Sequence, residues 1–492
     1  MTPKKTSATN GFLFFDVIIV GAGLSGIGAA YHIQSKCPKK TFTVLEARGT
    51  MGGTWDLFRY PGIRSDSDMY TLGFPFNPWE NPKAIADGPS ILQYIKDTAA
   101  KFGIDKKIQY NHKVTDASWS DDEKMWTLTL DAHGKELHQK MKCRFLFMCT
   151  GYYDYENGYT PDFPGRETFE GRTVHPQKWD ESLDYTDKTV VLIGSGATAV
   201  TLAPELSKKA RKVTVLQRSP TYVISLPSED PVANFLSKIL PVSARYRIVR
   251  WKNIILAIGM YNASRKWPNG MKKLIQKGVK KELGEDYDIR HFAPQYKPWD
   301  QRLCIVPDSD MFIAIKAGKV EMVTDTISRF TPKGILLNSG EELEADIIIT
   351  ATGLKVQLMG GMSIRINGEL GDTAKAHAYR GVMFSDVPNF AIAVGYTNAS
   401  WTLKCDLNCR FVAKLLNYMD KHHYAVCVPR YDTSMPSEPL IDLNSGYVTR
   451  VIDKLPKQGT KHPWKVYQNY VRDLMTLQFG SVNDKYLEYR QG

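Results

Sequence analysis

Two glycine-rich segments have the residue types and spacing that a dinucleotide requires. The first, Gly21-Ala-Gly23-Leu-Ser-Gly26, lies between an apolar stretch and a stretch with helical character. Gly21 suits a tight turn, Gly23 lets the backbone approach a pyrophosphate, and Gly26 lets helix and strand pack closely. Glu46 ends the next apolar stretch, and its carboxylate can accept a hydrogen bond from a ribose hydroxyl. This segment therefore predicts a dinucleotide-binding unit.

The second glycine-rich segment, Gly194-Ser-Gly196-Ala197-Thr198, is followed by a different strand ending. It too lies between an apolar strand and a helix, but Gln217-Arg218-Ser219 stands where the first unit has an acid. A carboxylate there would repel a 2′-phosphate, whereas a guanidinium can bind it through two hydrogen bonds. Either Arg218 binds NADP in this way or it is an ordinary surface arginine. We expect this unit to bind NADPH through Gly194, Gly196, Ala197, Thr198, Arg218 and Ser219.

Two dinucleotide units in one chain are typical of hydride transfer from a nicotinamide to a flavin, which favours FAD at the first site. The polar loop that follows the first unit begins Gly52-Gly53-Thr54-Trp55 and is either an ordinary surface loop or, as we expect, a cofactor-facing one. Two apolar strands end in Thr150-Gly151 and Thr352-Gly353, which suits chain crossings between two such domains. We therefore place Gly53, Thr54, Trp55, Thr352 and Gly353 near the cofactors.

The elements that must hold these motifs alternate between strands and helices. This order predicts an α/β fold with two Rossmann-like dinucleotide-binding domains and a helical insertion. We expect the FAD-binding domain over residues 1–155 and 370–492, and the NADPH-binding domain over residues 156–222 and 300–369. The helical insertion is expected over residues 223–299 and should cover the active site.

The 492-residue chain has a formal net charge of +12, without a recognisable nucleic-acid-binding motif, so we expect no nucleic-acid partner. Its densest basic stretch, residues 245–281, is interleaved with apolar residues. It is either a helical region that touches anionic lipid or an exposed helical face over a core. No apolar run approaches the ~18 residues of a membrane-spanning helix. With no export signal and seven scattered cysteines, we expect a cytoplasmic protein with reduced thiols, peripheral membrane association remaining open. Nothing in the sequence indicates an oligomeric state.

The segment between the two units carries a longer pattern. Phe169-Glu-Gly171-Arg-Thr-Val-His175-Pro-Gln-Lys-Trp179-Asp180 matches the Baeyer–Villiger monooxygenase fingerprint, F-x-G-x-x-x-H-x-x-x-W-P/D, at every fixed position. From about Asp16 onwards, the chain resembles the type I enzymes of this family, and among them the ethionamide-activating branch. The similarity is clearest over residues 52–74 and 298–304.

The resemblance implies a reaction and the residues that serve it. NADPH would reduce FAD, oxygen would be activated at the flavin C4a carbon, and one oxygen atom would be inserted beside a ketone carbonyl to give an ester or lactone. The same enzymes can oxidise sulfur in thioethers or thioamides. Arg302 corresponds to the active-site arginine, Asp66 to the acid that pairs with it beside the cofactor, and His175 to a residue of linker movement. The family's C-terminal tryptophan has no clear match in this chain: Trp401 and Trp464 are both candidates, and we assign neither.

Other classes of protein share parts of this pattern. A sibling flavin monooxygenase would oxidise only nitrogen or sulfur. A pyridine nucleotide–disulfide reductase would need two redox cysteines beside the flavin, and the usual positions lack them. A membrane-associated electron-transfer flavoprotein would not need Arg302, Asp66 and the linker fingerprint. No second His or Cys lies at ligand spacing from His175, so we expect no metal.

Overall fold

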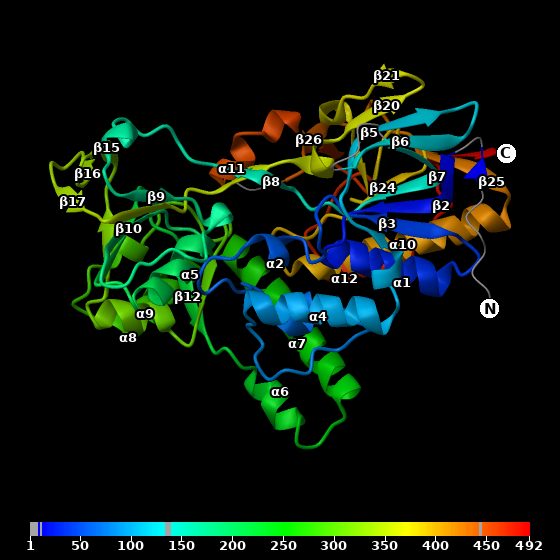
Figure 1. Ribbon diagram of the computed structural model, residues 1–492. Helices are drawn as coiled ribbons and strands as arrows, with labels where there is room; N and C mark the ends of the chain where they lie inside the picture. The colour runs from blue at the N-terminus through cyan, green and yellow to red at the C-terminus, as the bar shows by residue number, and fades with distance from the viewer. Residues whose placement is uncertain (1–7, 10–11, 133–138, 442–444) are drawn as a thin grey trace.

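The computed structural model describes residues 8–9, 12–132, 139–441 and 445–492, and its main elements form two sheet-centred units side by side (Figure 1). The first sheet has ten strands and is built around β2 (Phe12–Val20), with β3 (Phe42–Leu45) and β7 (Gln139–Met148) parallel to it on either side. Ile18 and Ile19 of β2 point to opposite faces and are both fully buried, so both faces of this sheet are covered. The other strands are β1 (Ala8–Thr9), β4 (Ile108–Gln109), β5 (His112–Ser120), β6 (Met125–Ala132), β20 (Ser363–Ile366), β21 (Glu369–Leu370) and β24 (Phe390–Ile392).

Helices from distant parts of the chain cover the first sheet. The helix α1 (Leu24–Lys36) begins directly after Gly23 and packs against α10 (Trp401–Lys421), which is mostly buried. The short helices α2 (Thr54–Leu57) and α3 (Met69–Leu72) and the longer α4 (Gly88–Lys101) follow the first βαβ unit. The N-terminal ends of α1 and α10 are thereby brought to the same side of the sheet.

The second sheet has five parallel strands in the order β14-β11-β10-β18-β9. Its strands are β9 (Arg172–Val174), β10 (Thr189–Ile193), β11 (Lys212–Gln217), β14 (Val320–Thr324) and β18 (Ile347–Thr350). The helix α5 (Ala197–Leu206) follows β10, and α9 (Asp310–Lys316) packs beside α5. Val190 and Leu192 are fully buried under these helices, as expected for a parallel sheet covered on both faces. The expectation of an α/β fold with two Rossmann-like units is confirmed.

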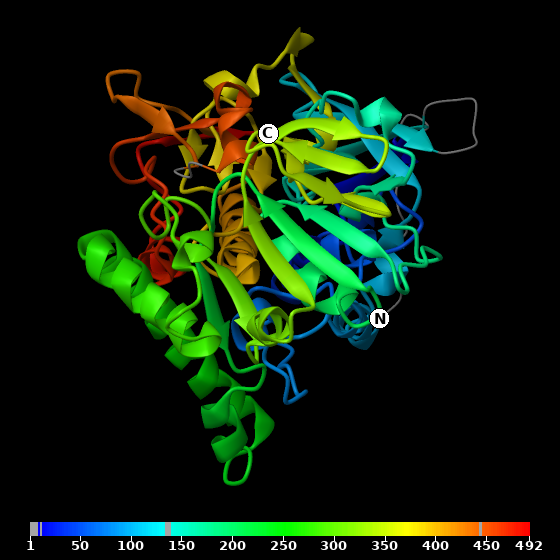
Figure 2. The same cartoon turned by 90° about the vertical axis from the view of Figure 1, so that its left-hand side faces the viewer.

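The insertion consists of α6 (Pro231–Leu236), α7 (Val242–Lys266) and α8 (Pro268–Leu283), and it projects from the two sheets as an arm (Figure 2). Arg250 of α7 fastens this arm to the first unit. Its buried guanidinium donates hydrogen bonds to the carbonyl oxygens of Tyr70 at 2.6 Å and Gly73 at 2.9 Å. These carbonyls lie at the end of α3, where the short helix leaves them without internal partners.

One expectation about chain organisation needs correction. The strand β20 pairs with β5, and β21 pairs with β20, so residues 363–370 join the first sheet rather than the NADPH-binding unit, and the boundary falls before residue 363. Within the basic stretch 245–281, Arg250 is buried and Lys252 forms an ion pair with Asp230. Arg250 and Lys252 therefore help to fix α7 in place.

Smaller elements connect these parts. Two antiparallel strands, β8 (Tyr153–Gly158) and β19 (Leu354–Val356), carry the chain between the two units, and the parallel pair β12 (Val223–Leu226) and β13 (Cys304–Pro307) flanks the insertion. The remaining elements are β15 (Ile327–Thr331), β16 (Gly334–Leu337), β17 (Glu342–Glu344), β22 (Ala378–Tyr379), β23 (Met383–Phe384), β25 (Tyr424–Pro429), β26 (Ser437–Pro439), α11 (Gly446–Thr449), β27 (Lys457–Gly459), α12 (Tyr470–Asp473), the π-helical turn η8 (Leu474–Phe479) and β28 (Leu487–Gln491).

Candidate active site

The first glycine loop leaves no room for side chains. Gly21 has a φ of +104°, and a Cβ on it would lie 2.6 Å from the carbonyl oxygen of Cys149. A Cβ on Gly26 would lie 1.8 Å from the carbonyl oxygen of Gly21, which any larger residue would displace. Gly23 faces Gly53 across a narrow gap, since a Cβ on Gly23 would lie 3.5 Å from the Cα of Gly53. The two loops therefore present bare backbone to each other, as a pyrophosphate site requires.

Glu46 lies where the sequence places it, at the end of β3, and it is buried. One carboxylate oxygen accepts a hydrogen bond from the backbone N–H of Ala22 at 2.8 Å, and the other accepts from the N–H of Arg48 at 3.0 Å. Burial raises the pKa of Glu46, while these two hydrogen bonds oppose the rise. The carboxylate thereby ties the end of β3 to the first glycine loop.

The second glycine loop is more open. Gly194 has a φ of +135°, and its Cβ would lie 2.4 Å from the carbonyl oxygen of Ala351, but a Cβ on Gly196 would meet nothing within 4 Å. Ser195 donates a hydrogen bond to the carbonyl oxygen of Ser219 at 2.9 Å, which joins the loop to the end of β11. Arg218 is exposed at that same end. The loop and the strand ending expected to recognise NADPH are therefore adjacent.

A cavity of about 790 Å³ lies between the two units and the insertion, and all three contribute to its wall. The first unit contributes Gly23, Gly53, Thr54, Trp55 and the loop around Asp66; the second contributes Ala197 and Thr198; the arm contributes Asn253, Ile254 and Ala257 of α7. This volume is in the range of sites that bind small molecules. One cavity thus borders both glycine loops.

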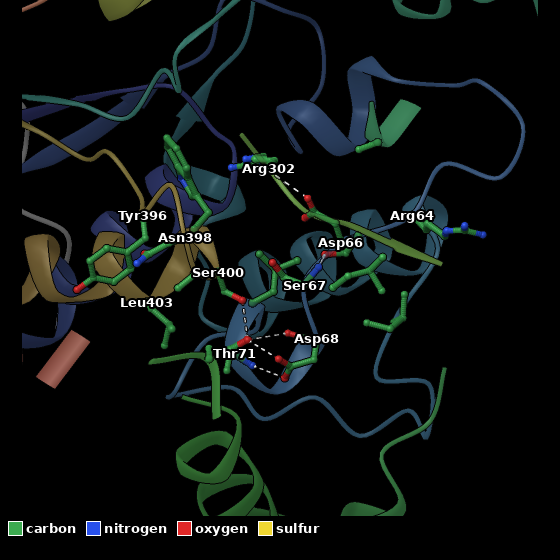
Figure 3. A pocket seen from close by; sticks show the side chains of 18 of the residues that line it. Arg64, Asp66, Ser67, Asp68, Thr71, Arg302, Tyr396, Asn398, Ser400 and Leu403 are labelled. Atoms are coloured by element: carbon green, nitrogen blue, oxygen red, sulfur yellow. Dashed lines mark hydrogen bonds and ion pairs between the residues drawn. The ribbon is translucent and has the colours of Figure 1, made fainter. Parts of the chain in front are cut away.

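Arg302 and Asp66 meet in the wall of this cavity (Figure 3), where Nη1 of Arg302 lies 3.3 Å from Oδ2 of Asp66. Asp66 belongs to the loop between α2 and α3, and Arg302 precedes β13, so the first unit and the segment after the arm contribute one residue each. Tyr152, Asp66 and Tyr153 raise the pKa of Arg302 well above its usual range, although burial opposes them. Arg302 therefore remains a cation at neutral pH.

Three tyrosines that we did not predict surround this pair. Tyr152 and Tyr153 follow the Thr150-Gly151 crossing, and their hydroxyls lie 2.7 Å apart. Burial raises the pKa of Tyr153 to about 12 and raises those of Tyr152 and Tyr447 further, so all three are neutral at ordinary pH. The only signal in the sequence was the position of the tyrosine pair directly after a strand ending in Thr-Gly. The site thus surrounds its fixed cation with neutral hydroxyls.

A second polar cluster lies deeper in the same wall (Figure 3). Thr71 donates its hydroxyl proton to Asp68 at 2.7 Å or shares it with the hydroxyl of Ser400 at 2.6 Å. Asp68 also caps α3, and burial raises its pKa against the hydrogen bonds from Asn253 and Thr71. The cluster joins α3, α7 and the start of α10.

The two candidate tryptophans lie in different surroundings. Trp401, at the start of α10, lines the cavity and stacks on Tyr152 with ring centroids 5.1 Å apart, while its indole N–H donates to Ser25 at 2.8 Å. Trp464 is fully buried against Tyr379 and is absent from the cavity wall. Of the two, only Trp401 is in a position to contact a bound molecule.

The linker fingerprint lies outside the cavity wall. Phe169 packs against Phe330, and Asp180 forms an ion pair with Arg172 at 2.6 Å. Gly171 lies close to the backbone of Asp346, since a Cβ on Gly171 would lie 2.5 Å from the carbonyl oxygen of Asp346. Trp179 packs on the core of the second unit. The fingerprint therefore shapes the path of the linker along the second sheet.

His175 connects this linker to the second chain crossing. Its Nε2 lies 3.3 Å from the carbonyl oxygen of Gly353, and its Nδ1 accepts a hydrogen bond from the N–H of Gln177 at 3.2 Å. Thr352 donates to the carbonyl oxygen of Tyr159 at 2.6 Å. Thr352 and Gly353 are absent from the cavity wall, so they hold the crossing strands together rather than lining that space. Their expected place beside the cofactors stays a prediction.

Thiolate chemistry is disfavoured at the cysteines of this chain. The seven cysteines, all in described residues, are buried and free. Burial raises the pKa of Cys37 to about 11 and those of Cys304 and Cys405 to about 12, which disfavours thiolates. Among the residues that the structure describes, no group of three or more His, Cys, Asp or Glu side chains could hold a metal ion. None of the helices in the described ranges is long and apolar enough to cross a membrane.

Taken together, the fold and the site define a protein with two dinucleotide units around one cavity. Residues 68–359 match the family described as flavin-binding monooxygenase-like, and residues 19–86 match the NAD(P)-binding Rossmann-like domain. The chain is 53% identical over 477 residues to the FAD-containing monooxygenase EthA of Mycobacterium tuberculosis H37Rv, covering 96% of this chain and 97% of that protein. It is 46% identical over 478 residues to the probable FAD-binding monooxygenase AlmA of Acinetobacter baylyi, covering 96% of each. The chain therefore belongs to the flavin-binding monooxygenase-like family.

Solved structures agree in fold. Oxidized steroid monooxygenase bound to NADP superposes with a TM-score of 0.77 at 21% identity, covering 98% of this chain and 100% of that one. The open structure of cyclohexanone monooxygenase gives a TM-score of 0.76 at 18% identity, covering 97% and 100%. At these identities the likeness concerns the fold. Together with the relatives, it confirms the resemblance to Baeyer–Villiger monooxygenases.

Proposed function

We propose that this protein binds FAD and NADPH and inserts one atom of O2 next to a ketone carbonyl, giving an ester or lactone. We propose that it also oxidises sulfur in thioethers or thioamides. The observation that carries the proposal is the Arg302–Asp66 pair, which lies in the wall of a cavity that borders both glycine loops. The proposal rests on this position, because a fixed cation beside two dinucleotide loops suits the stabilisation of negative charge during oxygen transfer.

The residues present fit the two cofactors. Gly23 and Gly53 face each other with bare backbone, which suits the FAD pyrophosphate, and Glu46 lies at the strand end where a ribose would be bound. The open Gly196 and the exposed Arg218 suit NADPH. In the cavity wall, Nε of Arg302 and Nε1 of Trp299 are buried donors without a hydrogen-bond partner among the described residues. Unpartnered buried donors indicate groups that await an acceptor.

When bound and reduced by NADPH, the flavin would supply the activated oxygen. The residues of this chain would stabilise the charge that develops and hold the substrate. Arg302 stabilises negative charge where it develops on the carbonyl oxygen of the substrate, and Asp66 orients the guanidinium at 3.3 Å. The walls contributed by Ile254 and Ala257 of α7 exclude water from that place and hold the apolar part of the substrate.

The two alternatives differ in what they require. Oxidation of nitrogen or sulfur alone needs no cation for a carbonyl oxygen, so Arg302 favours the ketone reaction. A disulfide reductase needs a reactive cysteine pair, whereas the thiols here are buried with raised pKa values. Buried free thiols also support the proposed cytoplasmic location, where thiols stay reduced.

A product assay tests the proposal. The FAD-loaded protein is given NADPH with a panel of methyl ketones and thioethers, and products are identified by mass spectrometry. We expect esters to appear in step with NADPH loss, and sulfoxides from the thioethers. Sulfoxides alone would assign the protein to the sibling class, and hydrogen peroxide alone would overturn the monooxygenase proposal for these substrates.

A further inference from the structure

The projecting arm holds almost the whole net charge of the chain. Residues 231–283 contain twelve Lys and Arg and one acid, Glu282, so they carry a formal charge of +11, against +12 for the entire chain. Three of these cations form ion pairs with acids outside the segment: Lys252 with Asp230, Arg265 with Asp300, and Lys280 with Glu285. Six others are exposed and take part in none of the ion pairs found among the described residues, namely Lys238, Arg247, Lys266, Lys273, Lys277 and Lys281.

The outer face of α7 is apolar as well. At 100° per residue, Ile248, Trp251 and Ile255 fall on one side of this helix, opposite the buried Val249, Arg250 and Ile254. They are 48%, 41% and 61% exposed. Lys266 at the end of α7 lies on the same side, and the exposed Arg247 lies at the edge of that side near the beginning of the helix. A helix that is apolar on its outer face as well as toward the core indicates a partner.

This apolar face continues onto the C-terminal segment. Trp251 contacts Tyr470 with ring centroids 5.8 Å apart, and Tyr470 begins α12, which runs into η8. In this segment Val471 is 43% and Met475 is 57% exposed. The exposed apolar residues of α7 and those of α12 and η8 therefore form one surface, which we call the α7 face: Ile248, Trp251, Ile255, Val471 and Met475.

The cavity reaches the surface next to the α7 face. Leu256 directly follows Ile255, lines the cavity and is 61% exposed. Ala257 and Met260, on the next turn of α7, also line the cavity. A molecule that lies against the α7 face is thus one helix turn from the cavity wall.

We propose that the α7 face docks on an anionic lipid surface, and that hydrophobic substrates pass from the lipid along α7 into the cavity. The positive charge of the arm favours an anionic lipid surface over a second copy of the chain. A second copy of the chain bound through the same face would bring two segments of charge +11 together, which is unfavourable, whereas an anionic bilayer neutralises them. Exposed apolar residues with flanking cations are typical of proteins bound in the membrane interface. The passage of substrate rests on the proposed function, but the docking does not.

Co-sedimentation of the full-length FAD-loaded protein with vesicles tests the docking. The vesicles are phosphatidylcholine alone or phosphatidylcholine with phosphatidylglycerol. We expect binding only to the anionic vesicles, and loss of that binding when Ile248, Trp251 and Ile255 are all changed to Ser. The matched control is Ile313→Ser with Leu370→Ser, two residues that are 61% and 65% exposed outside the arm, and it should bind as the wild type does.

A second set of variants tests the role of charge. Arg247→Gln with Lys266→Gln should weaken binding to anionic vesicles by about fivefold per charge removed. Changing the exposed Lys316 and Lys319 of the second unit to Gln should leave it unchanged. Absence of binding to anionic vesicles would overturn the proposal. So would light scattering that shows an oligomer in the wild type and a monomer in the Ser variant, because the α7 face would then cover a second copy.

Kinetics separate docking from substrate passage. The Ser variant should raise KM for a long-chain methyl ketone supplied in anionic vesicles and leave KM for a short, water-soluble ketone unchanged. An equal change in both would contradict entry from the lipid. If neither ketone is oxidised, the proposed function fails, while the vesicle measurements still decide the docking.

Discussion

Arg302 and Asp66 lie 236 positions apart in the chain, yet Nη1 of the arginine is 3.3 Å from Oδ2 of the aspartate. The contact forms because the segment that returns from the helical arm passes over the loop that follows the first dinucleotide unit. The two side chains are 34% and 37% exposed, and both line the cavity. A cation held by a carboxylate at this position is the centre of the functional account.

Replacement of Arg302 should remove oxygenation without removing the flavin. In Arg302→Ala the positive charge at the substrate oxygen is lost, so turnover of ketones should fall by about 100-fold or more. FAD binding, measured by flavin absorbance after gel filtration, should stay intact. Arg64→Ala is the control, because Arg64 points away from Asp66 and pairs with Asp310 (Figure 3). Normal ketone turnover by flavin-loaded Arg302→Ala would contradict the assigned role.

Removal of the Tyr152 hydroxyl should have a smaller effect. Tyr152→Phe retains stacking on Trp401 but loses the hydrogen bond to Tyr153, so kcat should fall by about fivefold with little change in KM. Tyr489→Phe is the control, because it removes a hydroxyl that donates to the carbonyl oxygen of Val482 at 2.7 Å, outside the cavity wall. Equal kcat values for the two variants would show that the Tyr152 hydroxyl plays no part in the reaction.

The two glycine loops should respond differently to an added methyl group. Gly26→Ala places a Cβ 1.8 Å from a backbone oxygen, so the loop must shift, and the free energy of unfolding should fall by about 1–3 kcal/mol with loss of bound FAD. Gly196→Ala meets nothing within 4 Å and should keep the Tm of the wild type. Thermal unfolding followed by circular dichroism measures both, and equal Tm losses would show that steric crowding is not the cause.

Arg218 should distinguish the two nicotinamide cofactors. Loss of a charge-assisted contact with the 2′-phosphate in Arg218→Gln should raise KM for NADPH by about tenfold or more and leave KM for NADH unchanged. Arg211→Gln is a matched control, because Arg211 precedes β11 while Arg218 follows it, and both are exposed. An unchanged KM for NADPH would make Arg218 a surface arginine.

Thiol reactivity should be low and pH-dependent. Burial raises the pKa of Cys37 to about 11, whereas an unfolded cysteine ionises near 9.0. A raised folded pKa means that the stabilisation is complete below pH 9.0 and is lost as pH rises through about 11. The native protein should therefore react slowly with Ellman's reagent at pH 8, and the free energy of unfolding should decline above about pH 9. Rapid modification of two cysteines at pH 8 would instead favour disulfide chemistry.

The sequence predicted what depends on local contacts. Gly21 and Gly26 lie in one strand–turn–helix unit, so the fold class followed from their spacing. By contrast, β20 has four residues, too few for a periodic pattern, and its pairing with β5 was missed. The Arg302–Asp66 pair was expected only from family resemblance. Tyr447 joins it from the C-terminal segment, and no sequence pattern links residues that approach only through tertiary folding.

The most direct test of the central claim supplies isotopically heavy oxygen gas to the FAD-loaded protein with NADPH and a methyl ketone. Cofactor loss and product mass are recorded together. The account predicts that each NADPH consumed yields one ester that carries one heavy oxygen atom, and that Arg302→Ala yields none. Consumption of NADPH with hydrogen peroxide as the only product formed from the oxygen, or an ester without the heavy atom, would contradict it.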